Sequence, residues 1–179
     1  MMTKIVFAGY GGQGILTLGQ IVANIAMNQD KEVTWMPSYG AEMRGGTANC
    51  AVVISDKVIG SPMVRSQIDI LVAMNPPSLD KFLKQVKPGG QIYVNTSLIK
   101  DKIIREDIQI VEIDASSIAQ QVGNMRVANM VMLSGFLKKT DLFTIEDVQQ
   151  VLDKTFKSRK PELIPLNLKA IEEGLKALE

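Results

Sequence analysis

The sequence predicts a layered α/β protein with a three-layer, Rossmann-like arrangement: a mainly parallel or mixed sheet with helices on both faces. Three observations support this. Short β-branched and aromatic runs alternate with helical patterns, glycine or proline bounds several of these runs, and the first run leads through a glycine-rich turn into a helix. With 179 residues, 46% of them hydrophobic, the chain can build one sizeable core. We therefore expect one domain over residues 1–179.

The first strand is expected at Lys4–Ala8, because "KIVFA" is a short apolar run that ends at glycine. From Gly12 onward, apolar residues recur at three- and four-residue spacing, which predicts a helix. The other expected strands are Glu32–Pro37, the paired segments Cys50–Ser55 and Lys57–Gly60 around a tight turn, Asp69–Met74, Gln91–Val94 and Ile108–Asp114. Because the pair at Asp56-Lys57 breaks strict strand–helix alternation, it is the reason to expect a mixed sheet.

Helices are expected in the second half of the chain and after one internal strand. One can begin after the prolines of "NPPS", and Thr144 with Asp147 three residues later resembles a capping box. The others are expected near residues 115–121, 126–138, 144–154 and 165–178. Parallel strands place their carboxyl ends together, so the first glycine turn should lie at the ligand-binding edge of the sheet.

Composition excludes several classes of function. Lys and Arg number 20 against 19 Asp and Glu, so no overall field favours nucleic acid or an anionic membrane. The chain has no histidine and one cysteine, so we expect no catalytic residue, no metal ligands and no resident iron–sulfur cluster. No apolar run approaches membrane-spanning length and no signal peptide is recognisable, so a cytoplasmic location is expected.

The turn "GYGGQG" fits the spacing of a dinucleotide-binding fingerprint through Gly9, Gly11 and Gly14. The amides of Gly12, Gln13 and Gly14 are expected to face outward at the positive end of the helix, where they could hold an anion. No acid follows the second expected strand to bind a ribose, and no Lys-Ser or Lys-Thr follows the glycines. An anion site and a purely structural corner both remain open, whereas an ordinary NAD site is disfavoured.

A second unusual segment is "PSYGAEMRGGTANC". In a parallel sheet it would emerge at the same edge as the first glycine turn. Its polar residues are set among glycines that permit close approach of a ligand or partner. The alternative is a solvated loop with an internal Glu42–Arg44 contact. The candidate site residues of this segment are Ser38, Tyr39, Glu42, Arg44 and Gly45.

Taken together, "GYGGQG" and "SYGAEMRGG" resemble the gamma subunit of the 2-oxoacid:ferredoxin or flavodoxin oxidoreductases, and the similar domain of single-chain pyruvate:ferredoxin oxidoreductases. The resemblance continues through "ANCAVVIS", "MNPPSLDKF", "PGG" and "NMVMLSGF". Ser134-Gly135 departs from the Gly-Ala expected of the family, although both pairs are small. Within the family, the loop is most similar to the 2-oxoglutarate type, followed by the pyruvate type.

The resemblance implies a non-catalytic subunit of an enzyme that converts a 2-oxoacid, coenzyme A and oxidised ferredoxin into acyl-CoA, carbon dioxide and reduced ferredoxin. Thiamine diphosphate and the iron–sulfur clusters are then expected on partner alpha, beta and ferredoxin-like delta subunits, and no cofactor is expected to be tightly bound here. A homodimer contact within the complex is left open. The rival hypotheses are a self-sufficient NAD(P)- or flavin-binding oxidoreductase and a purely structural subunit.

The resemblance also implies a coenzyme A role for the matching loops. Amides from Gly11 to Gly14 could take a phosphate and Arg44 could supply a cation, while Gln13 could bridge to a ligand or partner. Glu42 is expected to orient Arg44 or to pair across a subunit interface. Outside these loops, Cys50 is interpreted as a buried small hydrophobe rather than a reactive thiol. For Asn75, a place at the ligand edge and a turn-capping role are both open.

Overall fold

A computed structural model describes residues 1–39, 46–158 and 160–179, except for the side chain of Tyr39. One sheet of six strands, in the order β2-β3-β1-β4-β5-β6, runs through the molecule. Its strands are β1 (Met2–Tyr10), β2 (Glu32–Tyr39), β3 (Thr47–Ser55), β4 (Ile68–Ala73), β5 (Val86–Asn95) and β6 (Gln109–Ile113). Strands β1, β4, β5 and β6 pair in parallel, whereas β3 pairs antiparallel with both β1 and β2. The predicted mainly parallel, mixed sheet is therefore confirmed.

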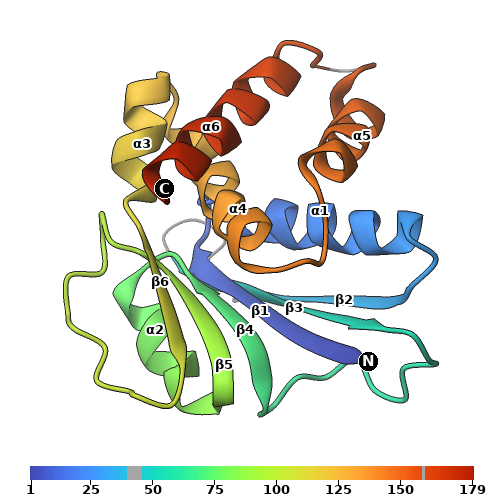
Figure 1. Cartoon of the computed structure of the whole chain (residues 1–179), viewed down its shortest axis with the longest axis vertical. Coiled ribbons are helices and arrows are strands. Elements are labelled where there is room, and N and C mark those ends of the chain that lie inside the picture. Colours follow the sequence, from blue (N-terminus) through green and yellow to red (C-terminus); the bar gives the residue numbers. More distant parts are fainter. Residues whose placement is uncertain (40–45, 159) are drawn as a thin grey trace.

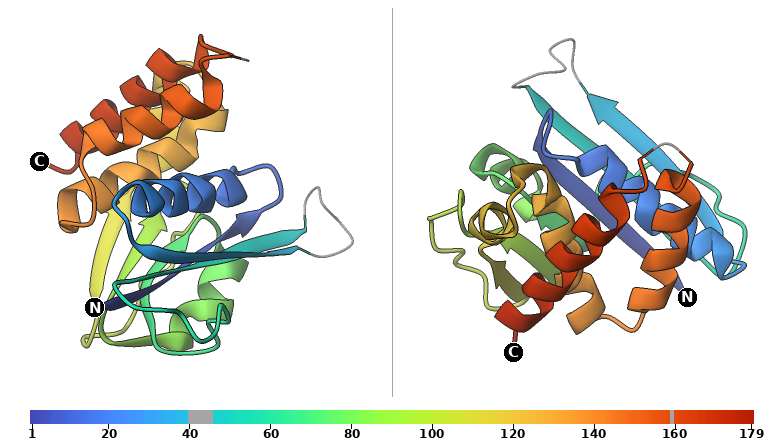
Figure 2. Two further views of the ribbon diagram at one scale, coloured as in Figure 1. Left: turned by 90° about the vertical axis from the view of Figure 1, so that its right-hand side faces the viewer. Right: turned by 90° about the horizontal axis from the view of Figure 1, so that it is seen from above.

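Helices cover both faces of this sheet, as predicted, but unequally (Figure 1). They are α1 (Ile15–Asn28), α2 (Pro76–Phe82), α3 (Ala115–Val122), α4 (Ala128–Lys139), α5 (Ile145–Phe156) and α6 (Leu163–Ala177), with short 3₁₀ turns η1 (Leu83–Gln85) and η2 (Met125–Val127). Figure 2 shows α2 alone on one face and the other five helices stacked on the opposite face. In the described residues, no helix is both long and apolar enough to cross a membrane.

The larger core lies on the five-helix face. It joins α1, α3, α4, α5 and α6 to the sheet through fully buried side chains such as Phe7, Tyr93 and Phe136. The smaller core lies under α2, where Leu79 and Phe82 pack against Ile92 and its neighbours. The two cores fix the sheet at the centre of three layers. Helix α4 is buried all round from Ala128 to Phe136, because it packs on the sheet and α6 packs on it.

The expected strand pair around Asp56-Lys57 is wrong. Strand β3 does end at Ser55, but residues 57–60 form no strand. Both edges of β3 are already occupied, by β1 on one side and β2 on the other, so no edge is left for a following hairpin strand. The mixed sheet arises instead from the antiparallel β2–β3 hairpin. Asp56 accepts a hydrogen bond from Lys31 Nζ at 2.5 Å, which joins the ends of the β2–β3 ladder.

Several predicted boundaries shift because tertiary hydrogen bonds extend or shorten the local pattern. Strand β5 begins at Val86 rather than Gln91, since it pairs with Ile68 across a register shift. The helix expected from Arg126 begins at Ala128, after η2, in which the Asn124 side chain accepts a bond from the Arg126 amide at 3.0 Å. The capping box is confirmed: the Asp147 amide donates to Thr144 Oγ1 at 3.3 Å, and the Thr144 amide donates to Asp147 Oδ2 at 2.9 Å.

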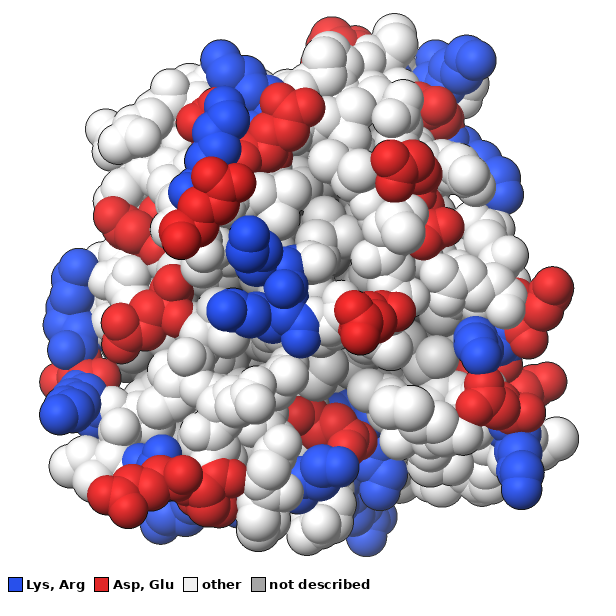
Figure 3. Space-filling view, in the orientation of Figure 1, with Lys and Arg blue, Asp and Glu red and all other residues white. Residues whose placement is uncertain are grey.

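Charged side chains of both signs are interspersed over the face shown in Figure 3, and neither sign covers it alone. This distribution agrees with the near balance of 20 basic and 19 acidic residues. Any preference for an anionic ligand must therefore arise from a local arrangement of donors rather than from the field of the whole protein.

Candidate functional site

The glycine turn lies at the point where the chain changes direction across the sheet. After β1 the chain crosses the five-helix face through α1 to β2, whereas after β4 it crosses the opposite face through α2 to β5 (Figure 1). Strands β1 and β4 are parallel neighbours, so their carboxyl ends flank a topological switch point. Open α/β sheets bind ligands in the crevice at such a point. The glycine turn after β1 and Asn75 after β4 form its two sides.

The Gln13 side chain bridges the two sides of this crevice. Its side-chain oxygen Oε1 accepts hydrogen bonds from the Tyr10 amide at 2.6 Å and from Asn75 Nδ2 at 3.3 Å. A Cβ at Gly9 would come within 2.7 Å of that oxygen, so the glycine is needed for the side chain to fold back. Asn75 is fully buried and also caps α2, because its Oδ1 accepts from the Ser78 amide at 2.9 Å. The turn-capping role of Asn75 is thus confirmed, while its role toward a ligand stays a prediction.

The expectation that all the turn amides face a ligand is corrected. The Gly11 amide donates to the Gly46 carbonyl at 2.9 Å, and the Gln13 amide donates to the Tyr10 carbonyl at 3.1 Å. Gly12 and Gly14 keep the left-handed backbone that favours glycine, with φ of 100° and 73°. The first intrahelical bond of α1 joins the Leu18 amide to the Gly14 carbonyl, so the amides of residues 15–17 precede it. The backbone amides that could bind an anion are therefore found less in the turn than in the first residues of α1.

The second predicted segment begins at the same edge of the sheet as the glycine turn. The bond from Gly11 to Gly46 ties the turn to the start of β3, and β2 ends beside that start through the pair Tyr39 and Ala48. Ser38 is exposed and pairs with Asn49, two strands away from β1, which separates it from the turn by roughly 10 Å. Glu42, Arg44 and Gly45 lie outside the described residues.

A pocket of about 260 Å³ adjoins the glycine turn on the five-helix face. The glycine turn and α1 contribute one side of it, while residues of η2, α4, α5 and α6 and of the loops before η2 and α6 contribute the rest. Sequence reasoning assigned no role to its polar residues Arg126, Asn129, Lys160 and Asn167. Their positions in the sequence are too far from the glycine turn for spacing to connect them. From the sequence alone, the basic stretch Lys154–Lys160 indicates a solvated face, with docking to a partner also open.

Asn129 connects this pocket to the turn. Its Nδ2 donates to the Gly14 carbonyl at 3.1 Å, and a Cβ at Gly14 would come within 2.9 Å of its Cγ. The third glycine of the fingerprint therefore allows α4, rather than a strand, to approach α1 closely. The only sequence signal for this contact was the "NMVMLSGF" segment, whose first residue is Asn129.

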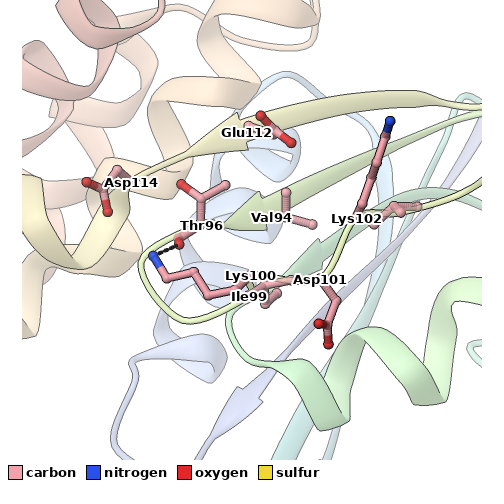
Figure 4. A pocket seen from close by; sticks show the side chains of 9 residues that line it. Val94, Thr96, Ile99, Lys100, Asp101, Lys102, Glu112 and Asp114 are labelled. Carbon is pink, nitrogen blue, oxygen red and sulfur yellow. Dashed lines mark hydrogen bonds between the residues drawn. The ribbon is translucent and has the colours of Figure 1, made fainter.

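A second pocket at the same edge, of about 370 Å³, follows β5 and β6 (Figure 4). Its two lysines extend in opposite directions, and Lys100 Nζ donates to the Thr96 carbonyl at 2.7 Å. Asp101, Glu112 and Asp114 also line it. A hydrogen bond from Ser97 lowers the pKa of Asp114, which keeps that carboxyl charged near neutrality. Three carboxyl groups make this pocket a poor site for an anion.

Cys50 lies inside the core, as predicted. It is fully buried, its Sγ donates to the Ile15 carbonyl at 3.6 Å, and burial raises the pKa of its thiol to about 12. It packs beneath Gly19, where a Cβ would overlap the sulfur. A buried neutral thiol neither attacks a substrate nor ligates a cluster. In the described residues, no group of three or more His, Cys, Asp and Glu could hold a metal ion.

We expect Cys50 to be unreactive toward a disulfide reagent in the native protein at about pH 8, because almost none of its thiol is ionised or accessible there. In guanidinium chloride the same thiol should react at once and stoichiometrically. The measurement is the release of chromophore with time in both states. Rapid labelling of the native protein, without loss of its circular dichroism, would contradict the burial of Cys50.

Fold and site together define an α/β protein with a crevice at a topological switch point and a pocket beside it. The chain belongs to the pyruvate ferredoxin/flavodoxin oxidoreductase family, whose model matches residues 4–177. The resemblance to gamma subunits of 2-oxoacid oxidoreductases is thereby confirmed.

Relatives of two different chain lengths support the same family. The ketoisovalerate oxidoreductase subunit VorA of Methanothermobacter marburgensis is 38% identical over 96% of this chain, but the chain spans only 35% of that protein. The 2-oxoglutarate synthase subunit KorC of Methanocaldococcus jannaschii is 34% identical, and the match covers 97% of this chain and 92% of that one. The chain thus corresponds to about a third of some relatives and to nearly the whole of others.

Solved structures of similar proteins support the same family. The gamma subunit of the keto/oxoacid ferredoxin oxidoreductase of Geobacter sulfurreducens is 31% identical with a TM-score of 0.79, covering 97% of this chain and 96% of that one. The 2-oxoglutarate:ferredoxin oxidoreductase of Magnetococcus marinus, solved with 2-oxoglutarate, coenzyme A and succinyl-CoA bound, has a TM-score of 0.88 at 24% identity. That match covers 99% of this chain and 32% of that one, and it shows a shared fold.

Proposed function

We propose that this chain is a single-domain, non-catalytic gamma subunit that completes a 2-oxoacid:ferredoxin oxidoreductase and contributes to its coenzyme A site. Thiamine diphosphate and iron–sulfur clusters reside on partner alpha, beta and delta subunits. The residues here fit that division, because the one cysteine is buried and protonated. When bound to the partners, thiamine diphosphate supplies the decarboxylation chemistry, while this chain binds and orients coenzyme A.

The observation that carries the proposal is the hydrogen bond of 2.9 Å from the Gly11 amide to the Gly46 carbonyl. It supports a joint role for the two family motifs, since it fixes the ends of both at one edge of the sheet. A Cβ added at Gly12 would meet no atom within 4 Å, so the outer side of the turn is open to a ligand. Coenzyme A carries phosphates that amide donors and a cation can bind.

The proposed site comprises the predicted residues of both motifs, with roles adjusted to the geometry. Gly9 and Gln13 shape the turn, and Gly11 links it to the second segment. Gly12 presents open backbone toward the ligand, and Gly14 lets Asn129 approach the turn. Ser38, Tyr39, Glu42, Arg44 and Gly45 are proposed to complete the site from the second segment. The gamma relatives serve enzymes for different 2-oxoacids, which supports placing substrate choice on other subunits.

Co-purification from the native host tests the assignment as a subunit. A tagged chain should bring down a thiamine diphosphate-binding partner and an iron–sulfur partner, and the complex should reduce ferredoxin with a 2-oxoacid and coenzyme A. Isolation of the chain alone, with NAD(P)H or flavin bound and turnover of its own, would favour the rival self-sufficient oxidoreductase.

Within the assembled complex, Arg44→Ala is expected to raise the KM for coenzyme A about tenfold, with kcat at saturation nearly unchanged, because it removes a charge-assisted contact to phosphate. Arg65→Ala is the matched control, since Arg65 is exposed and belongs to neither motif. Steady-state kinetics with varied coenzyme A makes the measurement. An unchanged KM would remove Arg44 from the site and favour a purely structural subunit.

A further inference from the structure

The 260 Å³ pocket beside the glycine turn, lined by Gly12, Gly14, Thr17, Arg126, Lys160 and Asn167 among others, has the features of a binding site. It lies where α1, of 14 residues, begins at Ile15 next to Gly14. The amino end of a helix carries partial positive charge, so the α1 dipole favours an anion at this position. Among the described residues, the amino end of α6 adds no free donor, because the Leu163 and Ile164 amides already bond backbone carbonyls and Pro165 has no amide hydrogen.

Asn167 supplies independent evidence that the pocket is built for a polar ligand. Only 8% of the residue is exposed, yet its carboxamide makes no hydrogen bond within residues 1–39, 46–158 and 160–179. The fully buried, unpartnered side-chain polar atoms of the described residues are Thr34 Oγ1 and Trp35 Nε1, so the Asn167 carboxamide keeps access to the pocket that it lines. A ligand in the pocket can therefore bond to it. The neighbouring Asn129, by contrast, already donates to the Gly14 carbonyl.

The charged residues that line the pocket favour a negatively charged ligand. Arg126 on η2 and Lys160 before α6 both line it, and no acidic residue is among its described lining residues. The pocket that follows β5 and β6 differs in this respect, since three carboxyl groups line it. Two cations, the amino end of α1 and the amide donor of Asn167 together match the acceptor oxygens of a phosphate group.

The size of the pocket limits how much of a ligand it can hold. At about 260 Å³ it falls just below the range of roughly 300 to 1,000 Å³ typical of whole small-molecule sites. Apolar side chains such as Met130 and Phe156 line the remainder. The dimensions therefore suit a phosphate and the group attached to it better than an entire coenzyme.

We propose that this pocket binds a phosphate group through Arg126, Lys160, Asn167 and the amino end of α1, as a subsite beside the glycine turn. Its assignment to the phosphorylated end of coenzyme A rests on the proposed function, whereas its phosphate chemistry does not. A free phosphate ion would use the same donors, so the experiment must separate the two sources.

The test measures binding of adenosine 3′,5′-bisphosphate to the full chain, or to the complex that it forms, by calorimetry. We expect binding that weakens about tenfold in Arg126→Ala and in Lys160→Ala, as each removes one charge-assisted contact. Asn167→Asp, nearly the same shape with a negative charge, should abolish it. Lys157→Ala is the matched control, because Lys157 is exposed in the same basic stretch and does not line the pocket.

Each outcome decides the proposal. Binding that is equally tight in Arg126→Ala, Lys160→Ala and the control, or equally tight for unphosphorylated adenosine, would overturn it. Both cations are exposed, so these two variants remain informative if Asn167→Asp fails to fold. Competition by inorganic phosphate at equal concentration would support the subsite but assign it to the free ion. If co-purification brings down no thiamine-binding partner while pocket-dependent binding persists, the proposed function fails and the subsite stands.

Discussion

Replacing Phe136 by alanine is expected to lower the free energy of unfolding by about 3 to 5 kcal/mol, the largest effect of any single truncation considered for this chain. Phe136 on α4 is fully buried and stacks against three rings. The centroid distances are 5.0 Å to Tyr93 on β5, 5.8 Å to Phe7 on β1 and 6.1 Å to Phe143. Alanine would lose all three contacts and leave a cavity between α4 and the sheet.

Urea unfolding followed by circular dichroism measures this effect. Phe136→Leu should cost less than the alanine variant, because it keeps most of the apolar volume while losing the ring stacking. Leu98→Ala is a surface control, since that side chain is 42% exposed, and it should shift stability by no more than about 0.5 kcal/mol. A loss in Phe136→Ala as small as that of the control would mean that the aromatic cluster does not hold α4 on the sheet.

Gly14→Ala is expected to destabilise the protein by about 2 to 4 kcal/mol, from two separate sources. A side chain at the left-handed φ of 73° costs roughly 1 to 2 kcal/mol in the backbone. The new Cβ would also come within 2.9 Å of Asn129 Cγ, and overpacking of this kind costs about 1 to 3 kcal/mol. Displacing Asn129 would break its bond to the Gly14 carbonyl and open the contact between α1 and α4.

Gly12→Ala is the matched control for this prediction. Gly12 also has a left-handed backbone, with φ of 100°, but a Cβ there would meet no atom within 4 Å. Gly12→Ala should therefore lower the free energy of unfolding only by the cost of placing a side chain on a left-handed backbone. The double variant Gly14→Ala with Asn129→Ala should lose less unfolding free energy than the sum of the two single variants. Asn129→Ala removes the side-chain atoms that the new Cβ at position 14 would overlap. Equal losses at Gly12 and Gly14 would show that close packing on Asn129 contributes nothing.

Local sequence determined much of the architecture. The run "KIVFA" and the glycines after it specify a strand, a turn and a helix through propensity and backbone freedom alone, and Thr144 with Asp147 specifies a helix start. The shared edge of the two segments followed from the expectation of parallel strands, and the family resemblance supplied the proposed function. These features depend on residues within a few positions of each other, which is why pattern and spacing could reveal them.

The partners across the sheet were decided only by tertiary structure. No local rule could show that β3 enters between β1 and β2, which leaves no edge for a strand at residues 57–60. Nor could spacing show that Gln13 turns inward to Asn75, 62 positions away, or that Asn129 meets Gly14 over 115 positions. The sequence by itself determined a glycine turn that can face an anion. Only the packing of α4 and α6 against α1 decided which cations and which buried amide stand beside it.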